Sequence, residues 1–247
     1  MPLFRLLILA HLIADFPLQS AQIYRLKRRY LAGQVPHAFI YLGTMALAGY
    51  PLIGYGSYWC FISAVATAHL MVDYLKVMFL DHSGARNDLW TFLLDQAMHI
   101  AVIAAVFMTP LPGLPELQGS IIQRLDRAGV ITTCIFFLVA TFGGVYLLDS
   151  AKRTLLDAPE CVLVSDGFSK YYGVIERGIL FALMAGGYVY CALVPLVLAV
   201  RVPLANYCAK TFQPRPFLLA RTDGAGNLLL AAICAAAAGF SGARINL

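Results

Sequence analysis

Long apolar runs, interrupted by charged residues, Pro and Gly, make up most of this chain. A helix needs about 20 mainly apolar residues to cross the hydrocarbon core of a bilayer, and several runs reach that length. The pattern therefore predicts an all-α fold, a polytopic transmembrane helix bundle of about seven spans, near residues 3–23, 35–56, 58–80, 89–110, 129–150, 172–200 and 226–242.

The runs group into two parts of one domain. We expect a four-helix membrane unit over residues 1–110 and three further membrane helices over residues 129–247. The Pro-rich stretch 201–225 is too broken to span a membrane and predicts an extended loop, because Pro interrupts a helix.

Composition and charge support the membrane assignment. Of the 247 residues, 60% are hydrophobic and 13% are charged, whereas soluble proteins average about 45–50% and about 25%. The net charge of +5 is modest, and Lys and Arg lie mainly in short loops, so we expect no nucleic-acid partner. The basic cluster at residues 25–29 predicts a cytoplasmic first loop and an amino terminus outside. The six cysteines form no C-x-x-C pair, which argues against a zinc ribbon.

Ionisable residues inside the apolar runs stand out, because a charge at mid-bilayer costs about 2.5–3.5 kcal/mol. Three of the predicted helices carry a His and an Asp four residues apart, on one helix face. These are His11 and Asp15, His69 and Asp73, and Asp95 and His99; Gln19 and Lys76 extend the first two sets.

The pairs are placed at matching depths. At about 1.5 Å per residue, the Asp residues lie about 9–12 Å from the cytoplasmic end of each span and the His residues about 15–18 Å. The order His-then-Asp reverses in the fourth helix, as alternating helix directions require. His37 opens the second helix at the same end, and we expect it to be shallower and a weaker ligand.

Imidazole and carboxylate groups on facing helices are a common way to hold a divalent ion such as Zn, Mn or Mg. The sequence therefore predicts metal ligands among His11, Asp15, His37, His69, Asp73, Asp95 and His99. Asp15, Asp73, Asp95 and Lys76 are candidate catalytic residues, with one carboxylate as general base and Lys76 contacting phosphate. Gln19, Lys76, Glu176 and Arg177 are candidate substrate-binding residues. The alternative is a hydrogen-bonded network that only fixes helix packing.

Several segments resemble an uncharacterised family of bacterial polytopic membrane proteins. They are HLIADFPLQ at 11–19, the single His37, AHLMVDYLK at 68–76, LLDQAMH at 93–99 and YYGVIERGIL ending at Leu180. The resemblance implies a multi-pass protein of the bacterial cytoplasmic (inner) membrane, and it adds Gln96 to the functional positions named above. It implies no activity, and membrane-bound metal-dependent hydrolases are similar only in their His/Asp-rich helices.

Three functions follow as hypotheses. The first is a metal-dependent hydrolase or transferase acting on a lipid or lipid-linked substrate at the cytoplasmic leaflet. The second is a proton- or cation-coupled transporter, in which the Asp and His residues relay protons or bind a cation. The third is a structural or partner-binding membrane subunit.

Overall fold

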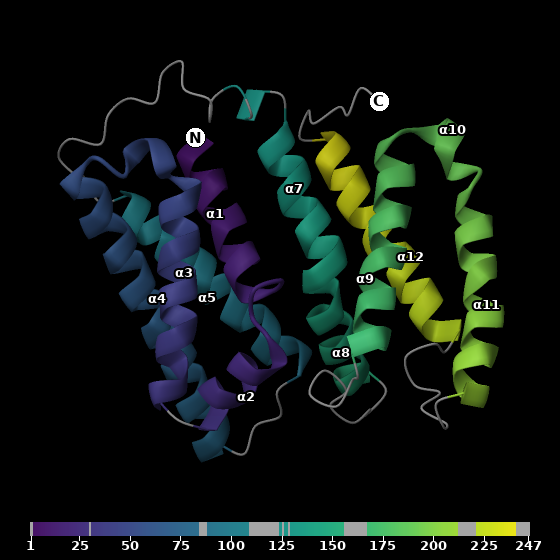
Figure 1. The fold of residues 1–247 in the computed structure, drawn as a ribbon, viewed down its shortest axis with the longest axis horizontal. Helices are drawn as coiled ribbons and strands as arrows, with labels where there is room; N and C mark the ends of the chain where they lie inside the picture. The colour runs from purple at the N-terminus through teal and green to yellow at the C-terminus, as the bar shows by residue number, and fades with distance from the viewer. Residues whose placement is uncertain are drawn as a thin grey trace. The chain divides into compact units, whose positions relative to one another are not determined.

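The computed structural model describes residues 2–29, 31–83, 88–108, 124, 126–127, 129–155, 167–211 and 221–240. Within these ranges the chain forms helices and turns and no strand (Figure 1). It divides into two compact units, the first comprising Met1–Arg127 with Ser150–Leu163 and the second Ala128–Asp149 with Val164–Leu247.

Three helical segments are long and apolar enough to cross a membrane: Gly56–Phe79, Leu89–Met108 and Val130–Leu155. Two apolar helices, Val189–Arg201 and Gly224–Phe240, are shorter. The protein is therefore a helical membrane protein. The three long segments correspond to the predicted runs 58–80, 89–110 and 129–150.

Four helices pack together in the first unit: α1 (Pro2–Asp15), α3 (Gln34–Ala48), α4 (Gly56–Ser83) and α5 (Leu89–Met108). Their shared core includes Leu7, Met45, Phe61, Val65 and Ile103, all nearly inaccessible to solvent. Figure 1 shows a short helix, α2 (Ala21–Arg29), lying at the lower end of this group. Helix α2 thus covers the lower end of the unit (Figure 1).

The first helix was predicted over residues 3–23, and its predicted end is wrong. Helix α1 stops at Asp15, followed by turns and then α2. Pro17 explains the break, since the residue before a proline is driven out of helical geometry and proline itself offers no N–H. A 3-10 turn at Leu31–Gly33 then leads into α3.

The second unit contains α7 (Val130–Leu138), a π-helical segment (Val139–Gly143) and the start of α8 (Gly144–Leu155) as one continuous helix. It continues with α9 (Gly167–Ala185), α10 (Tyr188–Cys191), α11 (Val194–Thr211) and α12 (Arg221–Phe240). Helix α12 packs against α9 and α7 around a core of Ala140, Phe181, Leu230, Cys234 and Ala235.

Two predictions fail in this unit. The run 172–200 is not one helix, because it breaks at Gly187 after the end of α9. The φ of Gly187 is 116°, a backbone conformation that glycine adopts easily and that is strained for other residues. The run 201–225 is not an extended loop, because α11 continues through Pro203 to Thr211 and α12 begins at Arg221. Apolar helices tolerate an internal proline where neighbouring groups satisfy the freed carbonyl.

Candidate metal centre

Helices α1, α3, α4 and α5 bring four histidines and three aspartates into one buried cluster in the first unit. The imidazoles are at most 1% exposed and the aspartates at most 9%. We call these residues the His/Asp cluster: His11, Asp15, His37, His69, Asp73, Asp95 and His99.

At the centre of the cluster, two imidazole nitrogens lie close to each other and to two carboxylate oxygens. His37 Nε2 lies 3.2 Å from Asp15 Oδ1 and 3.2 Å from His69 Nε2. His69 Nε2 lies 3.4 Å from Asp15 Oδ1 and 3.5 Å from Asp73 Oδ2. His37 Nε2 lies 3.6 Å from the same Asp73 oxygen. We refer to these four residues as the central ligand set.

His37 therefore lies at the centre of the site and level with Asp15, where the sequence analysis expected a shallower position; its rank as a ligand stays a prediction. Because α1 ends at Asp15 and α3 begins at Gln34, the first turn of α3 lies level with the last turn of α1. The ring of Tyr41, one turn further along α3, stacks on His69 with centroids 3.9 Å apart. This contact holds the His69 imidazole in place.

The remaining members surround the central ligand set at longer range. His11 Nδ1 is 3.8 Å from Asp15 Oδ2, and His99 Nδ1 is 3.8 Å from Asp95 Oδ1. His99 Nε2 is 3.9 Å from Asp73 Oδ1. Three overlapping groups could hold a metal ion: His11, Asp15 and His69; His37, His69 and Asp73; Asp73, Asp95 and His99.

Hydrogen bonding leaves the cluster incompletely satisfied. Both ring nitrogens of His99, and Nδ1 of His37 and of His69, have no hydrogen-bond partner among the residues that the structure describes. Each unsatisfied buried polar group costs about 1–3 kcal/mol. The described side chains do not satisfy these nitrogens, and a water or ion next to each of them would relieve this cost.

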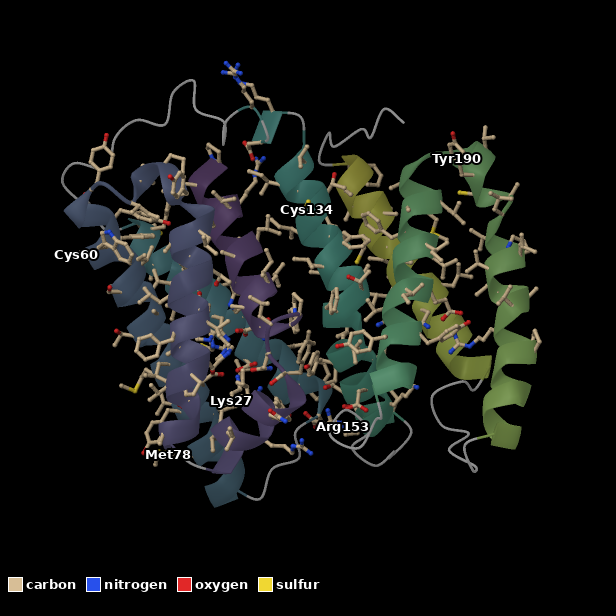
Figure 2. The ribbon with its side chains drawn as sticks, viewed as in Figure 1. Lys27, Cys60, Met78, Cys134, Arg153 and Tyr190 are labelled. Carbon is tan, nitrogen blue, oxygen red and sulfur yellow. The ribbon has the colours of Figure 1, made fainter. Side chains whose placement is uncertain are left out.

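Lys27 of α2 belongs to the site, although the sequence analysis placed it only in a basic cytoplasmic loop. Its Nζ lies 3.0 and 3.1 Å from the two oxygens of Asp73. Figure 2 labels Lys27 toward the lower end of the helix group. Burial alone lowers the pKa of this ammonium, but the Asp73 carboxylate reverses the effect and raises it above the ordinary value. Lys27 follows Ile23 by four residues and therefore lies on the apolar face of α2. This helical spacing could have indicated from the sequence that Lys27 faces the protein interior.

The other lysine of the site, Lys76 of α4, lies 2.9 Å from Asp95 Oδ2. The Gln96 amide also donates to that oxygen, at 3.2 Å. Lys76 is therefore engaged with a carboxylate in the structure, where the sequence analysis expected a phosphate contact. Gln19 is buried, and its Oε1 has no hydrogen-bond partner among the described residues.

Glu176 and Arg177, the remaining predicted site residues, lie in the second unit and form a buried network there. Glu176 Oε2 accepts hydrogen bonds from Arg201 and Asn227. The Arg177 guanidinium donates to the carbonyl oxygens of Ala140 (2.7 Å) and Thr141 (2.7 Å) in the π-helical segment, and to Asn227 Oδ1 (2.8 Å). Within the second unit, these contacts tie α9 to the π-helical segment and to α12.

The family comparison covers the part of the chain that holds the cluster. Residues 3–124 match the family model described as "Protein of unknown function (DUF3307)". No curated protein and no solved structure matches the chain. The matched range includes every member of the His/Asp cluster together with both lysines, and it stops short of the Glu176 network. Residues 3–124 of the chain are thus similar to an uncharacterised family, that of the DUF3307 domain.

Proposed function

We propose that this protein is a metal-dependent membrane hydrolase or transferase, in which the central ligand set holds one divalent cation and the substrate is a lipid or lipid-linked molecule. The observation that carries the proposal is the convergence of two imidazole nitrogens and two carboxylate oxygens from three helices.

The separations that join each imidazole nitrogen to the two carboxylate oxygens, and the two nitrogens to each other, match those of a tetrahedral zinc site. The five measured separations range from 3.2 to 3.6 Å. A regular tetrahedron with edges of about 3.4 Å has its centre about 2.1 Å from each corner, which is the bond length of zinc to His nitrogen and carboxylate oxygen. Zinc is therefore favoured over Mg, which requires octahedral geometry and mainly oxygen ligands.

The charges of the cluster also support a cation. Asp15, Asp73 and Asp95 contribute three negative charges, and Lys27 and Lys76 return two, which leaves one negative charge when the imidazoles are neutral. A divalent cation reverses this excess to one positive charge, which an anionic oxygen of water or substrate would neutralise. A protein-bound zinc ion supplies such an oxygen at neutral pH, because it lowers the pKa of bound water to about 7.

His99 and Asp95 are suited to move a proton beside that centre. They lie at i and i+4 on α5, with 3.8 Å between His99 Nδ1 and Asp95 Oδ1. His99 Nε2 points toward Asp73, and neither ring nitrogen has a hydrogen-bond partner among the described residues. Their role would be general acid and base, with Asp95 orienting the imidazole.

The site would lie inside the bilayer, toward one face. Asp73 lies six residues from Phe79 at the end of its span, and Asp95 lies six residues from Leu89, which corresponds to about 9 Å. His69 and His99 lie ten residues from these ends, or about 15 Å. We keep the prediction of about seven crossings of a bacterial inner membrane, and the basic α2 marks the cytoplasmic side.

Cysteine labelling tests this orientation. Tyr55, before α4, and Arg25, on α2, are both exposed. In a cysteine-free background, a membrane-impermeant thiol reagent should label Tyr55→Cys in intact cells and Arg25→Cys only after the membrane is opened. The reverse pattern would place the site at the outer leaflet.

A cation transporter remains the second candidate, and a specific observation favours it. The central ligand set would supply four protein ligands, whereas catalytic zinc sites normally have three and keep one position open. Hydrolysis would require one carboxylate to move away. Zinc flux into proteoliposomes that is lost in Asp15→Asn would establish the transporter and refute the enzyme.

Elemental analysis of the purified protein tests the metal centre itself. Wild type should contain close to one zinc per chain, and Asp15→Asn, which removes one corner without changing shape, should lose most of it. Asp126→Asn is the matched control, because Asp126 pairs with Arg5 outside the His/Asp cluster. Wild type without a divalent ion, or equal zinc in Asp15→Asn and the control, would refute the proposal.

A further inference from the structure

Lys27 places an ammonium group beside the proposed metal position. Its Nζ lies 3.0 Å from Asp73 Oδ2, the same oxygen that belongs to the central ligand set. A metal about 2.1 Å from that oxygen would therefore be at most about 5 Å from the ammonium. Two cations would share one buried carboxylate.

Cations at such a distance repel each other strongly inside a protein, because little water screens them. Asp73 alone cannot offset both, and the metal-loaded cluster carries one positive charge in excess. An oxyanion resolves both problems, because one of its oxygens can bind the metal as a fifth ligand, or in place of one carboxylate, while another accepts a hydrogen bond from Lys27 at about 2.8 Å. The geometry therefore calls for an anionic ligand between the two.

The position of α2 indicates that the anionic ligand is a phosphate. Helix α2 follows the end of α1, contacts α3, and lies at the end of the helix group where Asp15 and Asp73 are found. Lys27 faces inward, while Arg25 and Leu26 on the same helix are exposed. Short helices with basic and apolar exposed residues lie at the membrane interface, at the level of the lipid phosphates. Phosphate is the oxyanion that is present at this interface.

We propose that Lys27 and the metal together bind the phosphate group of the substrate, so that the substrate class is a phosphate ester. This inference rests on the proposed metal centre. Lys76 has no such part, because it pairs with Asp95, whose carboxylate lies outside the central ligand set.

The test uses the full-length protein in detergent, loaded with zinc and freed of excess metal, with inorganic phosphate as the titrant in calorimetry. Zinc-loaded wild type should bind phosphate at least fivefold more tightly than the metal-free protein. Lys27→Met should retain zinc and bind phosphate at least tenfold more weakly. Arg25→Met removes the same charge from the exposed face of the same helix and should bind phosphate as wild type does.

A second neutral variant, Lys27→Gln, keeps a hydrogen-bond donor for Asp73 and serves if Lys27→Met does not fold. Its phosphate binding should fall by the same factor. Equal phosphate affinity in wild type and both folded variants would overturn the role of Lys27 while leaving the metal centre intact. Absence of zinc from wild type would instead overturn the proposed function.

Two competitors define the ligand. A short-chain, water-soluble phosphatidic acid that displaces phosphate at lower concentration identifies a lipid headgroup as the source, and weaker displacement identifies a free phosphate compound. Both results support the proposal. Acetate that displaces phosphate at equal concentration would overturn it, because the site would then accept any oxyanion.

Discussion

Replacing His37 by Gln is the most direct test of the central ligand set. His37 Nε2 takes part in three of the five contacts that define the tetrahedron, with Asp15, His69 and Asp73. Gln is close to His in size and polarity, so the substitution removes the ligand nitrogen without opening a large cavity. We expect zinc affinity to fall while the helix group stays folded.

The magnitude follows from the number of ligands. Binding of zinc to four protein ligands at neutral pH has an apparent free energy of about 10–16 kcal/mol. Shared equally among the four, one ligand contributes about 2.5–4 kcal/mol, or about 10²- to 10³-fold in affinity. His37→Gln should therefore weaken zinc binding by about this factor.

The assay is competition for zinc with a chromophoric chelator of known affinity, on protein purified in detergent. Tyr41→Phe is the control, since it keeps the ring stacked on His69 and removes only a hydroxyl that has no hydrogen-bond partner among the described residues. Its zinc affinity should equal that of wild type. If His37→Gln binds zinc within threefold of wild type, the ion is not held at the central ligand set.

Two further predictions concern stability. Arg177→Leu leaves two carbonyls of the π-helical segment and the Asn227 amide oxygen without their buried donor. The free energy of unfolding in detergent should therefore fall by about 2–4 kcal/mol. An unchanged melting temperature would contradict a structural role for this network. Gly49→Ala places a methyl group against the Tyr58 hydroxyl and should lower the free energy of unfolding by about 1–3 kcal/mol. Gly43→Ala has open space around the new methyl group and should not destabilise the protein. Equal melting curves for the two variants would contradict this packing.

The apolar pattern was sufficient to predict an all-helical membrane protein. It also located the three segments long enough to cross a bilayer, because transfer of about 20 residues into hydrocarbon depends on composition and length alone. Helix ends were harder to predict. Pro17 ends α1, whereas Pro203 lies within α11, and only the surrounding packing distinguishes the two cases.

The candidate site shows the same division. The i,i+4 spacing placed His69 with Asp73 and Asp95 with His99 on common helix faces, since helical periodicity is a local property. That spacing could not show which residues of different helices meet. His37 became central and Lys27 entered the site only because α2 and α3 fold back over the end of α1.

The sequence by itself therefore determined that this protein lies in a bilayer. It also identified the ionisable residues that need a neutralising partner there, because burying an Asp in a bilayer is costly wherever it occurs. The tertiary structure decided how they are compensated. It brought two imidazole nitrogens to within 3.6 Å of each of two carboxylate oxygens, from three helices, and set Lys27 against Asp73. Distances between helices depend on how the whole chain packs, and no local pattern encodes them.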